Sequence, residues 1–205
     1  MNNSKQIIQY LEELAKALID LQVTLPFHIL IAGGAYMILQ NKRQFTEDID
    51  FALVEHPQSI PKGNQVFRVT CINADISRSY SSVPFSSKFK HAVFTIAQRH
   101  PGLAKDWMND EAAGYYYDDA PEPEVTFWRS FGNVIYVYLP TLEYMFATKI
   151  AAYRSKDEDD INLLMKELRI KSRIQAKTIV DLFLLPEAQK FWQVEENLDT
   201  LFPGG

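Results

Sequence analysis

Two aspartates separated by one residue are the strongest chemical signal in this 205-residue chain. Asp48 and Asp50 open an alternating apolar segment that predicts a strand over residues 49–54. Because side chains of a strand alternate between its faces, Asp48 and Asp50 should project from the same side. Carboxylates held this close repel each other unless a cation intervenes, and such oxygen ligands suit Mg²⁺ or Mn²⁺. The pair predicts a metal and phosphate site, although the same triplet also arises by chance on the solvent face of strands.

Two adjacent glycines precede the aspartates. Gly33 and Gly34 follow an apolar run, residues 28–32, that reads as a buried strand, and they precede the helix-forming residues 35–40. Glycine permits close approach of the backbone, and N–H groups at a helix N-terminus can face an anionic phosphate. We therefore expect the glycines to contact phosphate, with a purely packing role as the alternative.

Together these motifs resemble the nucleotidyltransferase superfamily of DNA polymerase β. The matching residues are Ala-Gly33-Gly34-Ala, then Arg43, then Thr46-Glu-Asp48-Ile-Asp50-Phe. In that superfamily a Gly-Gly or Gly-Ser turn and a D-x-D strand hold the nucleotide and its metal ions. The resemblance implies that the two aspartates bind Mg²⁺ or Mn²⁺, that the two glycines contact the phosphates, and that Arg43 contacts the triphosphate.

A second block, about a hundred residues further on, narrows the resemblance. The segment from residue 142 to residue 161 is similar to the K-x-x-A, R and K-D-x-x-D-I segment of AbiEii-type nucleotidyltransferases, a branch that includes toxins of bacterial toxin–antitoxin pairs. The resemblance implies that Lys149 and Arg154 bind the triphosphate and that Asp160, with or without Asp157, activates or positions the acceptor. Solvated charges on a helix face are the alternative for the two bases. The expected catalytic residues are Asp48, Asp50, Lys149 and Asp160.

The sequence leaves open how this second block is arranged. In one unbroken helix, about 100° per residue would bring Lys149, Lys156 and Asp160 onto one stripe. Ser155 and Glu158, however, have the spacing of a capping box. A capping box would start a new helix at this point, and the three side chains would then no longer lie on one stripe. Both arrangements are compatible with the residue pattern.

Polymerase-β-like sites normally contain a third carboxylate. Asp75 is the one apolar-acid-apolar candidate, and it lies beside a serine-rich loop. The number of metal ions is therefore open, and a single ion suffices if Lys149 replaces the charge of a second. Trp107-Met-Asn109 is similar to a tryptophan-asparagine step of the same branch, to which we assign no role.

Composition and charge exclude several classes of protein. With 47% apolar and 23% charged residues, the chain is neither disordered nor of low complexity. Its apolar runs fall short of the roughly 20 residues that span a bilayer, and its first residues lack the regions of a signal peptide. We therefore expect a cytoplasmic protein with no membrane partner. The net charge of −5 means that nucleic acid could be bound only at a local basic patch.

The remaining reactive side chains give weaker signals. Cys71, the single cysteine, permits no internal disulfide and is expected to be buried in a strand. The four histidines show no metal-ligand spacing. The four bases within residues 169–177 could meet an RNA backbone, although a solvated face is the commoner role of such a run.

The order of elements predicts an α+β fold. We expect a nucleotidyltransferase-like mixed sheet with flanking helices over residues 1–139, followed by a helical bundle over residues 140–205 that packs on it. In the first part of the chain, periodicity predicts helices over residues 4–21 and from 86 or 87 to 100, and strands over residues 66–72 and 134–139. Residues 110–124 are predicted to form an acidic loop. From residue 140 to residue 198 we expect helices, with interruptions near Ser155, Ser172 and Pro186.

The sequence thus predicts a nucleotidyltransferase that moves a nucleoside monophosphate from a nucleoside triphosphate to an acceptor hydroxyl with Mg²⁺. The resemblance implies a tRNA end, a protein or a small molecule as acceptor, and an antitoxin as partner if the chain is a toxin. Two alternatives stay open. One is a silent nucleotide- or partner-binding protein of the same fold, and the other is a phosphohydrolase or nuclease that uses the same metal site on water.

Overall fold

The computed structural model describes residues 1, 3–61, 63–72, 84–110 and 121–204. Within these ranges a six-stranded mixed sheet has the order β3-β5-β6-β1-β2-β4. The strands are β1 (Phe27–Ile31), β2 (Ile49–Leu53), β3 (Val66–Arg68), β4 (Met108–Asn109), β5 (Glu124–Phe131) and β6 (Ile135–Pro140). β1 pairs antiparallel with β2 and parallel with β6, which places the strand with the aspartates directly beside the strand that leads into the glycines.

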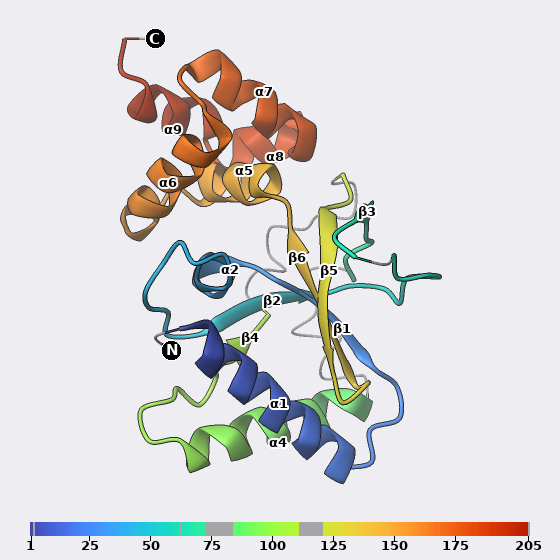
Figure 1. Cartoon of the computed structure of the whole chain (residues 1–205). Coiled ribbons are helices and arrows are strands. Elements are labelled where there is room, and N and C mark those ends of the chain that lie inside the picture. The colour runs from blue at the N-terminus through green and yellow to red at the C-terminus, as the bar shows by residue number, and fades with distance from the viewer. Residues whose placement is uncertain (2, 62, 73–83, 111–120, 205) are drawn as a thin grey trace.

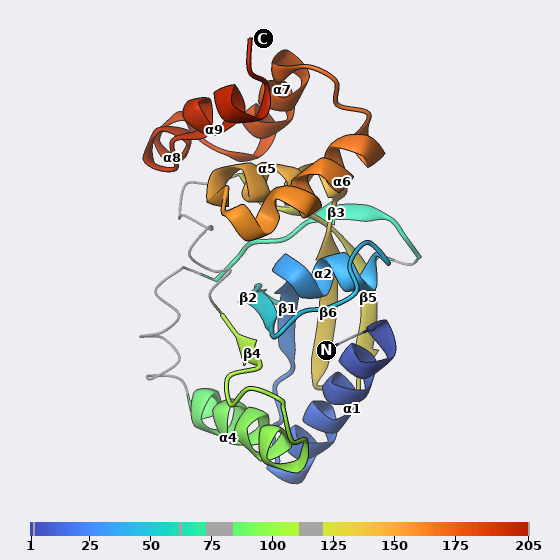
Figure 2. The same ribbon diagram turned by 90° about the vertical axis from the view of Figure 1, so that its left-hand side faces the viewer.

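In the described part of the sheet region the helices are α1 (Ser4–Asp20), α2 (Gly33–Leu39) and α4 (Pro84–Arg99). The Asn3 side chain caps α1 by accepting a hydrogen bond from the Gln6 backbone N–H at 3.0 Å. Ile7, Leu11 and Leu14 recur on one face of α1 and are fully buried. Figures 1 and 2 show α1 and α4 side by side at one end of the molecule, with α2 between the sheet and the C-terminal helices.

The C-terminal third is helical, as its periodicity predicts. Its elements are α5 (Leu142–Ala152), the 3₁₀ turn η2 (Ser155–Asp157), α6 (Glu158–Leu168), α7 (Arg173–Phe183), α8 (Pro186–Phe191) and α9 (Val194–Leu201). Thr141 and Ser172 cap α5 and α7 with their side chains, and Pro186 occupies the first turn of α8. The predicted interruptions near residues 155, 172 and 186 are therefore confirmed.

The expected α+β class agrees with this architecture, whereas several element boundaries differ. The strand predicted over residues 66–72 is shorter, and beyond Arg68 only an isolated bridge joins Cys71 to Val54. β4 and β5 were not predicted, because β4 is too short to show a period and β5 is mostly half-exposed. Most of the predicted acidic loop lies outside the described residues, and its last residue, Glu124, begins β5. None of the described helices combines the length and the apolar character that crossing a membrane requires.

Candidate functional site

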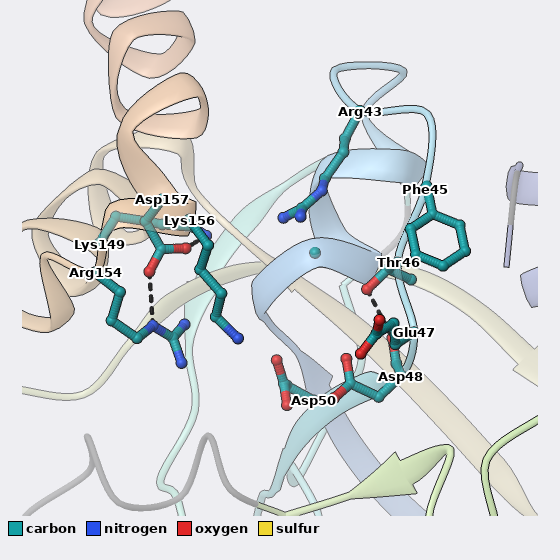
Figure 3. A pocket seen from close by; sticks show the side chains of 11 residues that line it. Arg43, Phe45, Thr46, Glu47, Asp48, Asp50, Lys149, Arg154, Lys156 and Asp157 are labelled. Carbon is teal, nitrogen blue, oxygen red and sulfur yellow. Dashed lines mark hydrogen bonds and ion pairs between the residues drawn. The ribbon is translucent and has the colours of Figure 1, made fainter.

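Asp48 and Asp50 project from the same face of the sheet. Phe51 on β2 and Phe27 on β1 pack against Phe89 of α4, with ring centroids 5.7 and 4.9 Å apart. α4 therefore covers the face that carries the odd-numbered residues of β2, and the even-numbered aspartates face away from it. Both aspartates line a single pocket of about 190 Å³, which Figure 3 shows from close by. The orientation follows from the D-x-D spacing.

The pocket lies between the sheet region and the start of the helical region. One side is formed by β2, the first turn of α2 and the loop that joins them, and the other side by the end of α5 and the turn η2. Its acidic side chains are Glu47, Asp48, Asp50 and Asp157. Its cationic side chains are Arg43, Lys149, Arg154 and Lys156. Such a balance suits a ligand that contains both a cation and negatively charged groups.

The two glycines allow side chains of the pocket to approach the backbone. Gly33 has a φ of +60°, and a Cβ atom there would collide with Oδ2 of Asp50 and lie 3.2 Å from its Cγ. A Cβ at Gly34 would lie 3.1 Å from Cβ of Thr46 and 3.3 Å from a guanidinium nitrogen of Arg43. Neither glycine can be replaced without displacing one of these side chains. Contact of the glycines with phosphate stays a prediction.

The residue beside Asp50 on the neighbouring strand is an asparagine, Asn109. β4 pairs in parallel with β2, and Asn109 is the Cα partner of Asp50. Trp107, which is fully buried, fixes the start of β4 by donating its indole N–H to the Val93 carbonyl of α4 at 3.0 Å. Asn109 therefore lies on the pocket face of the sheet beside Asp50. The sequence assigned no role to this tryptophan-asparagine step because nothing local predicted a strand of two residues.

The carboxylates of the pocket suit a metal ion that phosphate helps to bind. Across the described ranges, no three His, Cys, Asp or Glu side chains are grouped to hold a metal ion. Asp75, the predicted third carboxylate, lies outside those ranges. Asp48 and Asp50 nevertheless provide hard oxygen ligands on one face, and Mg²⁺ is commonly held by one or two carboxylates together with substrate phosphates and water. The residues present therefore fit Mg²⁺ bound with a polyphosphate, and not a closed structural metal site.

Lys149 lies in a buried ion-pair network. It is 4% exposed and donates to Asp157 and, at 2.7 Å, to Oδ2 of Asp160. Arg154 donates from Nε to Oδ2 of Asp157 at 2.7 Å, and Arg43 donates to Oδ2 of Asp160 at 3.1 Å. Three cations thus share two carboxylates. The bond from Arg43 also joins the loop between α2 and β2 to α6.

The helix of the second block is broken, so the single unbroken stripe is not the observed arrangement. α5 ends at Ala152, Tyr153 has a φ of +31°, and η2 follows before α6 begins. No capping hydrogen bond from the side chain of Ser155 is seen, so the broken arrangement does not depend on the predicted capping box. The break turns the chain back, which brings both Asp157 and Asp160 to Lys149.

The ionisation of Asp157 depends on its two cationic neighbours. Burial alone would raise the pKa of this carboxyl, but the hydrogen bonds and charges of Arg154 and Lys149 outweigh burial and lower the pKa below its ordinary value. Asp157 is therefore ionised at neutral pH and anchors the turn η2 against α5.

The structure brings together most of the residues that the sequence singled out. Gly34, Asp48, Asp50 and the bases Arg43, Lys149 and Arg154 all line the pocket. Gly33 lies directly against Asp50. Asp160 does not line the pocket, because it lies in the network behind Lys149 and is 4% exposed. Phe45 and Thr46, which the sequence analysis did not propose for the site, also line it, and their place in the loop before the D-x-D motif was the available signal.

Two histidines form a chain of hydrogen bonds that the sequence did not predict. Nδ1 of His28 lies 2.8 Å from the Tyr138 hydroxyl, and Nε2 of His28 lies 2.8 Å from Nδ1 of His56. Burial and the nearby charge of His56 lower the pKa of His28 to about 4.

Cys71 was expected to be buried, and the structure shows it as partly buried. Burial raises the pKa of its thiol to about 12.

Two of the four bases in the run near α7, Arg173 and Lys177, are paired with carboxylates. Arg173 donates to Glu195 and, at 2.6 Å, to Asp199. Lys177 donates to Asp181 at 2.5 Å. For these two bases the contacts favour the solvated-face interpretation over a binding surface for RNA.

Comparisons of the chain with protein-family models, with curated proteins and with solved structures find no match. Its function is therefore inferred from the residues of the pocket.

Proposed function

We propose that the chain is a nucleotidyltransferase that transfers a nucleoside monophosphate from a nucleoside triphosphate to an acceptor hydroxyl. The observation that carries the proposal is that Asp48 and Asp50 line one pocket with four cationic side chains. Twin carboxylates suit a divalent cation, and the cationic side chains of the same pocket suit phosphate groups. A magnesium nucleoside triphosphate satisfies both sides of the pocket with one ligand.

Asp48 and Asp50 are the residues that would hold Mg²⁺. When bound, the ion supplies positive charge at the phosphate oxygens and orients the reacting groups. The glycine at position 33 supports this assignment. Any side chain there would collide with the Asp50 carboxylate, so the glycine allows that carboxylate to lie on the pocket face.

The transfer forms a bond from the acceptor oxygen to the α-phosphorus and breaks the bond from that phosphorus to the bridging oxygen of pyrophosphate. The hydroxyl proton passes to a carboxylate of the pocket, and pyrophosphate leaves with the electron pair. Arg43 and Arg154 stabilise the negative charge on the phosphate groups as it shifts towards pyrophosphate. Asp160 holds Arg43 and Lys149 in place through its two ion pairs, which favours a positioning role for it over direct contact with the acceptor.

The experiment is a transfer assay with α-labelled nucleoside triphosphates, Mg²⁺, and separate pools of RNA, protein and small-molecule acceptors. Transfer gives a labelled acceptor, hydrolysis gives labelled nucleotide alone, and a silent binding protein gives only a Mg²⁺-dependent thermal shift. Asp48→Asn and Asp50→Asn should abolish labelling. Asp159→Asn is the matched control, because Asp159 is exposed on α6 and lies outside the pocket. Full labelling by either pocket variant would contradict the proposal.

A further inference from the structure

The four cations of the pocket differ in how many protein partners they have. Lys149 contacts two carboxylates, Arg43 is paired with Asp160, and Arg154 is paired with Asp157. Lys156 has no hydrogen-bond or ion-pair partner in the part of the chain that the structure describes, yet it is exposed and lines the pocket. An ammonium group without a protein partner retains its full hydrogen-bonding capacity for a ligand.

The turn η2 directs neighbouring residues to opposite sides. Asp157 points back to Lys149 and is 1% exposed. Figure 3 shows the side chains of Lys156 and Arg154 extending from the helical side towards Asp48 and Asp50 on the sheet side. The buried contacts of Asp157 fix the turn, so Lys156 is presented from a rigid base and not from a free loop.

The charges of the two sides favour one class of ligand. On the helical side, Lys149 and Arg154 are paired with carboxylates of η2 and α6, and Lys156 adds a cation that has no such partner among the described residues. Across the pocket lie the carboxylates of Glu47, Asp48 and Asp50. A polyphosphate that carries a divalent cation can contact both the acidic and the cationic side chains of the pocket, Lys156 and Arg154 among them, with one ligand.

We propose that Lys156 and Arg154 form the polyphosphate-binding pair of the pocket, and that Lys149 is a positioning residue that holds the turn η2. The assignment rests on the proposed function for its natural ligand, a nucleoside triphosphate. It differs from the expectation drawn from the sequence, in which Lys149 itself contacts the triphosphate. The buried, doubly paired state of Lys149 is the reason for the difference.

The test measures binding of inorganic tripolyphosphate with Mg²⁺ by isothermal titration calorimetry. Lys156→Gln should weaken binding about tenfold, as expected for the loss of a charge-assisted hydrogen bond, and Lys156→Arg should restore most of the affinity. Lys166→Gln is the matched control, because Lys166 is an exposed lysine of α6 outside the pocket. Unchanged affinity in Lys156→Gln, or an equal loss in Lys166→Gln, would overturn the proposal.

A second readout separates this proposal from the proposed function. In the transfer assay, Lys156→Gln should raise KM for the nucleoside triphosphate about tenfold with little change in kcat. If the wild-type chain binds tripolyphosphate through Lys156 but labels no acceptor, the polyphosphate site stands and the transferase activity fails. If transfer occurs and Lys156→Gln leaves both KM and tripolyphosphate affinity unchanged, the activity stands and the assignment of Lys156 fails.

Discussion

The carboxylate of Asp50 lies against the Cα atom of Gly33, so closely that a Cβ atom at residue 33 would overlap Oδ2. This contact joins the two sequence motifs, which lie on adjacent segments of the sheet region, into one site. It also explains the glycine in physical terms, because position 33 needs both a positive φ and the absence of a side chain.

Gly33→Ala should abolish transfer by displacing Asp50, in addition to destabilising the fold through backbone strain of about 1–2 kcal/mol. Gly102→Ala is the matched control, because Gly102 also has a positive φ but a Cβ there would meet nothing within 4 Å. Thermal unfolding should show a loss of stability in both variants, larger in Gly33→Ala because of the collision with Asp50, and the transfer assay should show a loss only in Gly33→Ala. Equal activity in the two variants would contradict the role of the contact.

Lys149→Met should destabilise the fold by about 3–5 kcal/mol, because it leaves the buried carboxylates of Asp157 and Asp160 without their shared cation. Glu167→Gln is the control. It removes an ion pair of 2.9 Å with Lys42 that also links the loop after α2 to α6, but solvent screens the exposed Glu167, so the loss of stability should be much smaller than in Lys149→Met. Chemical denaturation measures both values. Equal losses would show that Lys149 is not a structural anchor.

Acid should remove the stabilisation contributed by Asp157. Its pKa is lower in the folded chain than its ordinary value of 3.8, so the unfolded state binds a proton first as the pH falls. The contribution is complete above about pH 4 and is lost as the pH falls through the lower folded value. Asp157→Asn should therefore show a lower Tm at pH 7 and a shallower decline of Tm between about pH 4 and pH 2. A decline as steep as that of the wild type would contradict this prediction.

His28 should make stability depend on pH in a separate, higher range. Its pKa falls from 6.5 to about 4 on folding, so the unfolded state takes up a proton first and stability is lost between these values, by on the order of 3 kcal/mol. His28→Gln should flatten the change of unfolding free energy between pH 7 and pH 4. His91→Gln, which replaces an exposed histidine of α4, should leave the change intact. A flat profile in the wild type would contradict a depressed pKa of His28.

Local periodicity was sufficient to predict several of the elements that line the pocket. The alternation from Ile49 onwards predicted β2 and the shared direction of Asp48 and Asp50, and the helix expected from residue 140 is observed as α5 from Leu142. These features depend on side chains within a few residues of one another, which is the range over which strand and helix periods act.

Features that depend on long-range pairing could not be predicted in the same way. β4 exists because Asn109 pairs with Asp50, about sixty residues earlier in the chain. The contact between His28 and His56 arises only after β1 and the segment beyond β2 have come together. The burial of Lys149 depends on the left-handed Tyr153, which breaks the helix and turns Asp157 and Asp160 back towards α5.

A transfer reaction with label on either the α- or the γ-phosphate tests the central claim most directly, because it follows both products of one step. The wild-type chain should place the α-label on an acceptor and release the γ-label as pyrophosphate in equal amounts, and Asp48→Asn should do neither. Release of the γ-label as free phosphate with no labelled acceptor, or equal activity of Asp48→Asn, would contradict a nucleotidyltransferase site built on Asp48 and Asp50.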